Sequence, residues 1–445
     1  MSVAPGGCLP DDNRATLILG ELGALLLEAG LSVTDVRTSL ETVRDSSAID
    51  GDDLSFSVLP EMVIVTQTRT GAATVVSATT SDLSFRQAAQ ASQLVRHVQA
   101  GVTSLSDVPA QVAQIRGLVR SHAGLQWIVG SALLSSGLAI LFRCSWWAIV
   151  VTAVVGALVG VITTVLNRIQ GAVAIVPFVA TLTAATLVGA LAHGAGLTQV
   201  PMFAVCAPIA IIVPGALITN ALLELTARDI ITGSARLLYG LIMLGFMTAG
   251  IAAGAALTRL RIDPNSAALV GEAAAANSVT GGWQALPPLW LSWVGVVILA
   301  TGIGLAFGSG ARLTVLNVIV MTGTYALLAT LTPITGSIVA TGVTAGVLFI
   351  AAQLIDRLTF AVPATVSFQP AFLLLVPGTV GLAALASSHG STLGTRRPRL
   401  SVCASEPKSV QSSPRPGLRS EGHGSDITEP NRYSQLSRRG FRSFC

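Results

Sequence analysis

The sequence predicts a polytopic α-helical membrane protein in which a small α/β cytoplasmic domain precedes two membrane units. The composition is 51% hydrophobic and only 11% charged, with a mean hydropathy of +0.71. Apolar runs of membrane length recur from about residue 125 onward, whereas residues 1 to 120 carry ordinary charge. A soluble globule of 445 residues cannot hide so much apolar surface, so the chain is expected to cross a bilayer repeatedly.

Residues 1–120 are expected to form a compact cytoplasmic α+β domain. Apolar residues follow helical spacing in the first two segments. The third alternates, the fourth is a continuous apolar run typical of a buried strand, a short strand follows, and the last two segments are expected to be helices. In order, these segments are 14–29, 33–45, 54–58, 62–68, 74–80, 84–101 and 104–117. No basic region with an apolar core opens the chain, so no cleavable signal peptide is expected.

The last two helices of this domain are each preceded by a serine suited to an N-cap position. Ser84 precedes one helix and Ser104 the other. Ser104 and Asp107 have the spacing of a capping box, in which side chains bond the exposed amides of the first turn. We therefore expect such a box at Ser104.

Nine apolar runs after residue 120 predict membrane-spanning helices, because a helix needs roughly 20 apolar residues to cross the hydrocarbon core. The runs lie near 125–142, 146–166, 172–191, 200–219, 237–257, 287–307, 313–330, 333–355 and 362–386. Irregular backbone in lipid would leave amide and carbonyl groups unpaired, so these runs should be helical. Their glycine-rich and alanine-rich faces favour close packing in a bundle.

Two of these runs contain a proline and a glycine side by side in their middle. Pro214 and Gly215 lie in PIAIIVPGALITN, and Pro377 and Gly378 lie in PAFLLLVPGTVGL, which begins at Pro370. Proline removes a backbone donor and clashes with the carbonyl four residues back, and glycine gives the freed chain further conformations. Each pair should therefore divide its helix.

The paired breaks also indicate an internal repeat. Three pairs of similar residues recur in the same order at nearly the same separation. Gly215 and Gly378 are 163 residues apart, and Phe142 and Phe307 are 165 residues apart. Thr181 and Thr341, which end matching Val-Ala-Thr triplets, are 160 residues apart. The alternative is that membrane helices resemble one another by composition. If the repeat is real, its first unit has five spans, so the second unit enters from the opposite side. Inverted repeats of this kind are typical of secondary transporters.

The arginines favour a cytoplasmic N-terminus, because seven fall on that side of the five-span unit and three on the other. The seven are Arg116, Arg120, Arg168, Arg228, Arg236, Arg312 and Arg357; the three are Arg143, Arg259 and Arg261. The expected domains are then 1–120 in the cytoplasm, 121–260 as the first membrane unit, 261–286 as an external loop, 287–386 as the second unit with four recognisable spans, and 387–445 as a disordered basic tail.

Several stretches resemble the threonine/serine exporter family. The run LGELGALLLEAGLSVTDVRTSLETV, followed by SFSVLPEMVIVTQT and LVRHVQAGVTSLSDVPAQVAQI, is similar to the cytoplasmic domain of that family. The segments IVPGALITNALLELTARDIITGSARLL and SFQPAFLLLVPGTVGL resemble its two membrane units. The resemblance covers residues 14 to about 385. It implies a bacterial inner-membrane exporter of small hydroxy amino acids driven by the proton motive force.

The C-terminal stretch departs from the family pattern, in which a tenth span follows the second broken segment. Residues 387–445 are instead polar, with ten basic residues against four acidic ones, and such a composition does not form a packed core. With nine spans this basic tail would lie outside, against the positive-inside rule. The chain has 25 arginines and one lysine, as GC-rich coding would give. We therefore hypothesise a shifted reading frame, which would put full activity in doubt.

The two breaks are the first candidates for a substrate site, since half-helix ends can hold the charged groups of an amino acid. The residues concerned are Pro214, Gly215, Pro370, Pro377 and Gly378. Packing kinks without a ligand are the alternative. Leucine at Gly215 or Gly378 should abolish export, whereas leucine at Gly189 or Gly346 should be milder.

Asn220 and Glu224 are further candidates, because residues four apart share one helix face just beyond the first break. A carboxylate at membrane depth is typically functional, and Glu224 could exchange protons there. The alternative ends the helix before Glu224 and makes it an interfacial cluster with Arg228 and Asp229.

Polar residues elsewhere in the spans have two interpretations. Thr181 and Thr341 could line a polar path, although a threonine more commonly bonds its own helix backbone. Asn317 and Gln353 are better explained as interhelical hydrogen-bond partners than as ligand contacts.

No motif for catalysis or metal binding occurs. The five cysteines form no CxxC pair, the five histidines are scattered, and HExxH, GxSxG and P-loop patterns are absent from the sequence. We expect no enzyme activity, cofactor, metal or nucleic-acid partner. The expected partners are a small polar substrate such as an amino acid, protons and the bilayer, and a homo-oligomer is compatible with the sequence. A membrane-anchored hydrolase and a non-transporting structural membrane protein remain the alternatives.

Overall fold

The computed structural model describes most of the chain before residue 359 and none of the C-terminal tail. The described residues are 11–46, 54–79, 83–169, 171, 173–197, 199–263, 266, 269–275, 282–358 and 371. The chain divides into two compact units, residues 1–396 and 397–445, and every described residue belongs to the first. The ninth expected span, 362–386, and the basic tail therefore lie outside the described residues, apart from the single residue Ala371.

The N-terminal part contains the expected order of two helices, three strands and two helices. Its elements are α1 Asp11–Glu28, α2 Val33–Ser46, β1 Leu54–Leu59, β2 Met62–Gln67, β3 Ala73–Ser77, α3 Phe85–Gln99 and α4 Val108–Arg116, with a 3₁₀ turn at Leu105–Asp107. The sheet is antiparallel in the order β1-β2-β3, and Val63 pairs with Val58 on one side and Val76 on the other. Burial alternates along β1 and β2, because one face of the sheet is covered and the other is not.

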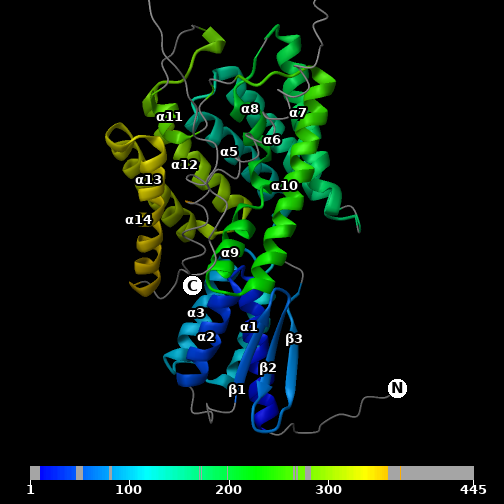
Figure 1. Ribbon diagram of the computed structural model, residues 1–445, viewed down its shortest axis with the longest axis vertical. Helices are drawn as coiled ribbons and strands as arrows, with labels where there is room; N and C mark the ends of the chain where they lie inside the picture. Colours follow the sequence, from blue (N-terminus) through cyan, green and yellow to red (C-terminus); the bar gives the residue numbers. More distant parts are fainter. Residues whose placement is uncertain are drawn as a thin grey trace, which may run out of the picture. The chain divides into compact units, whose positions relative to one another are not determined.

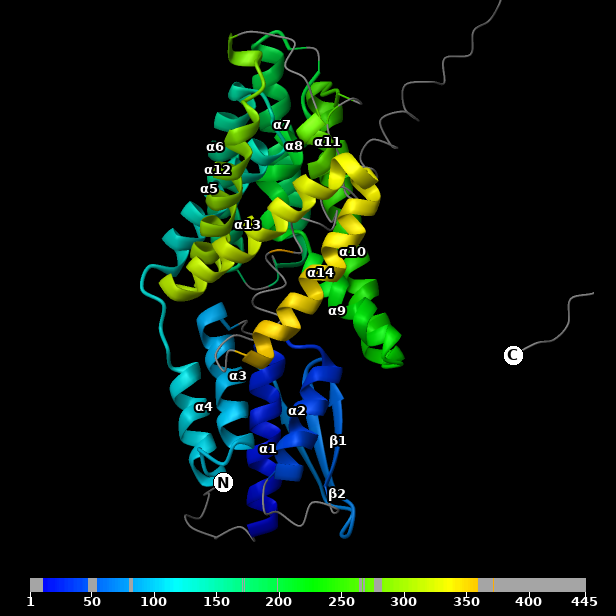
Figure 2. The same cartoon turned by 90° about the vertical axis from the view of Figure 1, so that its left-hand side faces the viewer.

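Helix α1 lies between the sheet and the pair α3 and α4 (Figure 2). It carries glycine where the sheet approaches most closely: a Cβ on Gly20 would meet Val76, and one on Gly23 would meet Leu40 and Val63. These close approaches bury leucine and valine side chains from both layers in one core.

A buried carboxylate at the end of α1 joins three segments of this domain. The side chain of Glu28 accepts hydrogen bonds from Arg116 on α4 and from the amide and hydroxyl of Thr79 after β3, at 2.6 to 3.0 Å. Burial raises the pKa of Glu28, but these bonds outweigh it and hold the pKa below its ordinary value.

The capping of the last two helices differs from the expected pattern. Ser84 forms the complete capping box, since its hydroxyl accepts from the amide of Gln87 and the Gln87 side chain accepts from the amide of Ser84. At the second helix the Ser104 hydroxyl donates to the Asp107 carboxylate at 2.8 Å and forms no capping bond to the backbone. The box expected at Ser104 is wrong because the two side chains bond each other instead.

The rest of the described chain is helical (Figure 1). Its elements are α5 Ala123–Leu141, α6 Trp146–Leu166, α7 Val176–Gly194, α8 Met202–Cys206 with a 3₁₀ extension Ala207–Ile212, α9 Gly215–Thr226, α10 Ile230–Thr258, α11 Val270–Ala275, α12 Leu289–Ala306, α13 Gly310–Thr335 and α14 Ser337–Leu358. Among the described residues six helices are long and apolar enough to span a membrane, or seven if the bent pair on either side of Pro214 is one span.

This count is lower than the nine expected spans because the ninth lies outside the described residues and the eighth is described only in part. The eighth, 333–355, corresponds to α14, a helix of 22 residues from Ser337 to Leu358, of which only the part up to Ala352 has continuously described side chains. Its expected start at Pro333 is wrong, because α13 continues through that proline and ends before Gly336, which has a φ of +81°. Near the end of a helix a proline interrupts little of the hydrogen-bond ladder, so a residue with positive φ is the stronger stop.

Glycines bring α5 and α12 into backbone contact. A Cβ on Gly130 or Gly137 would lie 2.6 Å from a backbone nitrogen of α12, and one on Gly302 would lie 2.6 Å from the backbone nitrogen of Leu134. Gly130 is opposite Ala306 and Gly137 is opposite Leu299, so the two helices are antiparallel. Such an approach is possible because glycine stands on one of the two helices at each of these points of closest contact.

Candidate functional site

The span expected at 200–219 is broken at Pro214. The helical turns on the two sides of the break meet at an angle of 69°. Pro214 has φ −76° and ψ 47°, and the amide of Gly215 turns back to the carbonyl of Val213 at 2.7 Å. The expected division of this helix is therefore confirmed, while Pro370, Pro377 and Gly378 lie outside the described residues.

Neither the neighbouring atoms nor the backbone conformation requires a glycine at position 215. No described atom lies within 4 Å of a Cβ built on it, and its φ is outside the left-handed region. The glycines of α5 and α12 are the opposite case, because any side chain there meets backbone atoms. A side chain at position 215 would thus fit into the structure.

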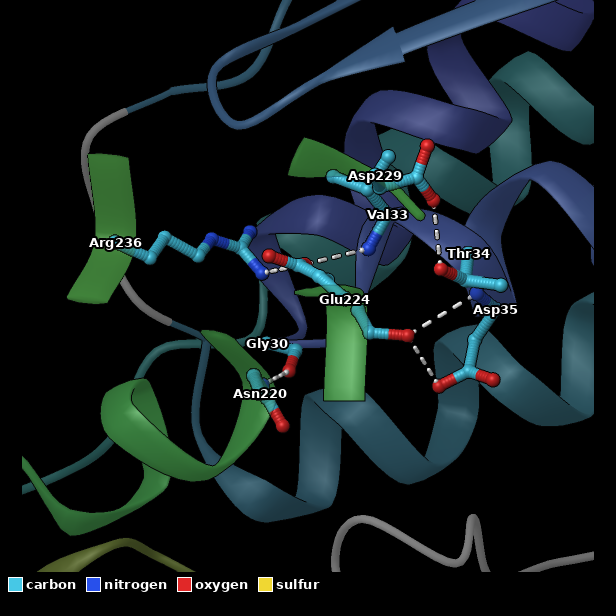
Figure 3. A network of polar contacts seen from close by, with 9 residues as sticks. Gly30, Val33, Thr34, Asp35, Asn220, Glu224, Asp229 and Arg236 are labelled. Carbon is cyan, nitrogen blue, oxygen red and sulfur yellow. Dashed lines mark hydrogen bonds and ion pairs between the residues drawn. The ribbon is translucent and has the colours of Figure 1, made fainter. Parts of the chain in front are cut away.

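Beyond the break, α9 carries Glu224 into a buried position against the N-terminal domain (Figure 3). Its Oε1 accepts a hydrogen bond of 3.0 Å from the amide of Val33, the first residue of α2, and forms an ion pair with Arg236 of α10. The carboxylate thus satisfies one of the amides that a helix leaves unpaired at its N-terminus. Its Oε2 has no partner among the described residues.

Asp229 and Asn220 extend this contact on either side of Glu224. Asp229, between α9 and α10, accepts from the Thr34 hydroxyl at 2.8 Å and the Arg37 guanidinium at 2.6 Å. The Asn220 amide donates to the carbonyl of Gly30 at 3.1 Å. We call this set the α2 junction; it comprises Gly30, Val33, Thr34 and Arg37 on one side and Asn220, Glu224, Asp229 and Arg236 on the other.

The electrostatics of the α2 junction keep Asp229 ionised. Burial raises the pKa of Asp229, but the hydrogen bonds from Arg37 and Thr34 outweigh it, so the pKa lies below its usual value. Its backbone amide also donates to the carbonyl of Glu224 at 2.9 Å, which closes the turn between the two helices. The turn that leads into α10 is therefore bonded to α2 through charged groups.

Neither sequence interpretation of Glu224 describes this arrangement fully. Helix α9 continues past Glu224 to Thr226, and the cation beside the carboxylate is Arg236 rather than Arg228. Asn220 and Glu224 share a helix face, as their spacing predicts, but both contact the N-terminal domain. Sequence patterns could not reveal this contact, because Val33 precedes Glu224 by 191 residues.

A second contact joins the N-terminal domain to α12. The amides of Phe85 and Arg86, at the start of α3, donate to the carbonyls of Phe307 and Gly308 at 3.0 and 3.3 Å. The rings of Phe85 and Phe307 stack with their centroids 5.1 Å apart, and Trp127 packs edge-on against Phe307. We call these five residues, together with Arg120, the α3 junction.

Arg120 strengthens the α3 junction from the linker between α4 and α5. Its guanidinium donates to the carbonyls of Leu305 and Ala306 at 3.0 Å, and these belong to the last turn of α12. A cation at a helix C-terminus satisfies carbonyls that the helix leaves unpaired and interacts favourably with the helix dipole.

The remaining candidates lie inside the helical region. Thr181 and Thr341 donate to the carbonyls of Pro177 and Ser337 in their own helices, at 2.8 and 2.7 Å. Asn317 is buried, but its Nδ2 has no partner among the described residues, so the expected interhelical bond of that amide is not observed. The side chain of Gln353 lies outside the described part of the chain.

In the described ranges no three His, Cys, Asp or Glu residues are grouped as a metal site would require.

Comparison with known proteins identifies a relationship over the first part of the chain. Residues 17–258 match the model of a family described as "Putative threonine/serine exporter". The match includes the N-terminal domain from within α1 onward and all helices from α5 to α10, which is more than half of the chain. No curated protein and no solved structure matches.

Proposed function

This chain belongs to the threonine/serine exporter family, and from that premise we propose that it exports threonine, serine or similar small polar metabolites across the cytoplasmic membrane, driven by the proton motive force. The single observation that carries the proposal is the family match, because it includes the N-terminal domain, the broken span and the α2 junction. A family of exporters also implies a multi-pass membrane transporter rather than an enzyme.

The glycine contacts between α5 and α12 support the proposed inverted repeat. Gly295 and Gly302 follow Gly130 and Gly137 by 165 residues each, the same offset as that between Phe142 and Phe307. Gly130 is in contact with Gly302, and Gly137 with Gly295. If the two units exchange places, Gly130 takes the position of Gly295 and Gly302 that of Gly137, so one contact is converted into the other. A twofold axis between inverted units requires this relationship.

The arginine pattern supports a cytoplasmic N-terminal domain. Arg120 and Arg236 lie at the ends of α5 and α10 that contact this domain, whereas Arg143 and Arg259 follow the opposite ends of the same helices. Because positive residues accumulate on the cytoplasmic side, we infer that the domain faces the cytoplasm and that residues 261–286 are external. Single cysteines at Ser266 and Ser278 test this inference, since labelling only from the inside would contradict it.

The break at Pro214 is the proposed centre of the translocation path. The first amides of α9 lack helical partners, and they form the partial positive end of the half-helix dipole. Such an end suits the carboxylate of an amino acid, and the matching break at Pro377 and Gly378 would supply the second half of the site. Thr181 and Thr341 would line the path between them.

Glu224 is the proposed proton-exchanging residue. It is the acidic side chain that α9 buries beyond the break, one of its oxygens lacks a partner among the described residues, and Arg236 balances its charge. Glu224→Gln keeps an acceptor for the amide of Val33 but removes the exchangeable proton. We expect this variant to insert and bind substrate while gradient-driven transport is lost.

Labelled threonine in inside-out vesicles tests the proposal. Vesicles that contain the chain should accumulate threonine when a proton gradient is imposed, and a protonophore should abolish the accumulation. Vesicles without the chain and vesicles with Glu224→Gln are the controls. Equal uptake with and without the chain would contradict export of threonine, and unchanged uptake by well-expressed Glu224→Gln would remove Glu224 from the coupling step.

A further inference from the structure

The two junctions attach one domain to two different parts of the membrane region. The α3 junction reaches the last turn of α12, and α12 is locked against α5 by backbone contacts at Gly130 and Gly137. The α2 junction reaches α9, which follows the break at Pro214. The N-terminal domain therefore spans from a closely packed helix pair to a half-helix that starts at a bend.

The two junctions also differ in the chemistry that holds them. The α3 junction consists of stacked aromatic rings, backbone hydrogen bonds and an arginine on carbonyl groups. The α2 junction depends on charged side chains: Glu224 with Arg236, and Asp229 with Arg37. Buried apolar contacts need no water, whereas the unpartnered Oε2 of Glu224 would gain hydrogen bonds if water entered. Opening is therefore easier at the α2 junction.

A hinge for such an opening is already present. Pro214 interrupts the helical hydrogen bonds, and the space beside Gly215 is free of described atoms within 4 Å of its Cβ position. Helix α9 is only 12 residues long and most of it is not buried. Because Gly233 and Gly240 of α10 lie close against α9, rotation about the break would carry Asn220 and Glu224 away from α2 together with the start of α10, without moving α5 or α12.

We propose that the N-terminal domain is the cytoplasmic gate of the transporter, with the α2 junction as a latch on the half-helix α9. The domain stays anchored on the α5 and α12 pair through the α3 junction while the latch opens and closes. This inference rests on the proposed function in one respect, namely that the path opened by the latch is taken to carry the substrate. The latch itself is a property of the contacts between α2 and α9.

The hydrogen-exchange rates of two backbone amides measure directly how often each of the two junctions opens. Val33 and Phe85 are the first residues of α2 and α3, so neither amide has a helical partner, and each donates across its own junction. After correction for intrinsic rates, the Val33 amide should exchange at least about ten-fold faster than the Phe85 amide. Equal protection of the two amides would overturn the latch, whatever the transported substrate.

Cross-linking then tests whether the latch gates transport. In the full chain without its native cysteines, Thr34→Cys with Asp229→Cys closes the α2 junction on oxidation. Ala88→Cys with Leu313→Cys is the matched pair across the α3 side, where Ala88 packs against Leu313. We expect threonine transport to stop when the first pair is cross-linked, to return on reduction, and to continue when the second pair is cross-linked.

Each outcome separates the gate from the transport proposal. Full transport with the first pair quantitatively cross-linked would overturn the gate. If the second cross-link alone stops transport, the anchored and moving contacts have been assigned the wrong way round, which also overturns it. Absence of threonine flux from the cysteine-free parent protein counts against the proposed substrate, and the amide exchange still decides the latch.

Discussion

The α5 and α12 pair and the half-helix α9 use glycine in opposite ways. Gly130, Gly137 and Gly302 allow two backbones to touch, and a Cβ at any of them would lie within 3.0 Å of a backbone atom. Gly215 at the start of α9 has no such neighbour among the described residues. In one region glycine fixes the distance between helices, whereas in the other it leaves a bend that can change.

This difference separates a scaffold from a moving part. Closely packed backbones tolerate little rearrangement, because every displacement loses many contacts at once. Helix α9 packs closely against α10 on one side, where a Cβ on Gly233 would lie 2.9 Å from backbone atoms of Ala221 and Leu225, but most of its other side chains are not buried and it has fewer such contacts to lose. Substitutions in the scaffold should therefore impair folding, and substitutions at the break where α9 starts should impair transport.

The largest effect is expected for Gly137→Leu. Its Cβ would lie 2.6 Å from the backbone nitrogen of Leu299, so α5 and α12 must separate along their length. We expect a loss of more than about 3 kcal/mol, at or beyond the upper end of the usual range for overpacking. Thermal unfolding in detergent measures it. Gly245→Leu on α10, where no described atom is near, is the control that should unfold like the wild type.

Glu224→Ala should have the next largest effect. It leaves Arg236 buried without its counterion and the amide of Val33 without an acceptor. Removing one partner of a buried pair typically costs about 3 to 5 kcal/mol. Glu224→Gln keeps the acceptor and should lose less. If the two variants have the same melting temperature as the wild type, the α2 junction contributes nothing to stability and the comparison fails.

Gly215→Leu should separate stability from function. The side chain has room, and leucine favours helix more than glycine, so the change in stability should be within about 1 kcal/mol. A stiffer break should nevertheless reduce threonine flux more than about ten-fold. Gly346→Leu, also in open space, is the matched control and should transport normally. Equal flux by both variants would make the break a packing kink.

The smallest effect is expected from acidification of Asp229. Its pKa is lowered in the folded protein, so its contribution is fully present above the unfolded value and is lost as the pH falls through the folded value. Because Arg37 is 36% exposed, the contribution is below about 1 kcal/mol. The stability difference between wild type and Asp229→Asn should be constant from neutral pH down to the ordinary aspartate range and vanish below it.

The sequence predicted the elements of the fold more successfully than their contacts. Hydrophobic patterns identified all seven elements of the N-terminal domain, because most of these elements bury one face. Proline next to glycine identified the break at Pro214, because the effect of proline is local. The α2 junction was not predictable, since charge pairing between α2 and α9 follows from the tertiary fold.

Glycines in the membrane helices show the same limit. Gly189 and Gly346 were both expected to tolerate leucine better than Gly215. Gly346 has no near neighbour among the described residues, but a Cβ on Gly189 would lie 2.1 Å from the Thr258 hydroxyl, where α7 meets α10. Leucine at Gly189 would therefore have to displace Thr258, so Gly346 is the better control for Gly215. A glycine-rich sequence shows that helices can approach closely, but not which glycines lie at the crossing.

The start of α10 was also misplaced. The apolar run predicts a span from 237, whereas the helix begins at Ile230 and includes Arg236. The arginine is accommodated because Glu224 neutralises it, and this compensation is invisible to a hydropathy scan. Charges paired between elements thus extend helices beyond their apolar runs.

Distances between spin labels test the central claim most directly. One pair, on Val129 of α5 and Val297 of α12, spans the scaffold, and the other, on Leu125 of α5 and Leu222 of α9, spans the moving part; all four side chains are exposed. We predict one unchanged distance for the first pair with and without threonine and a proton gradient. The second pair should gain a longer distance. A change in the first pair while the second stays constant would contradict the account.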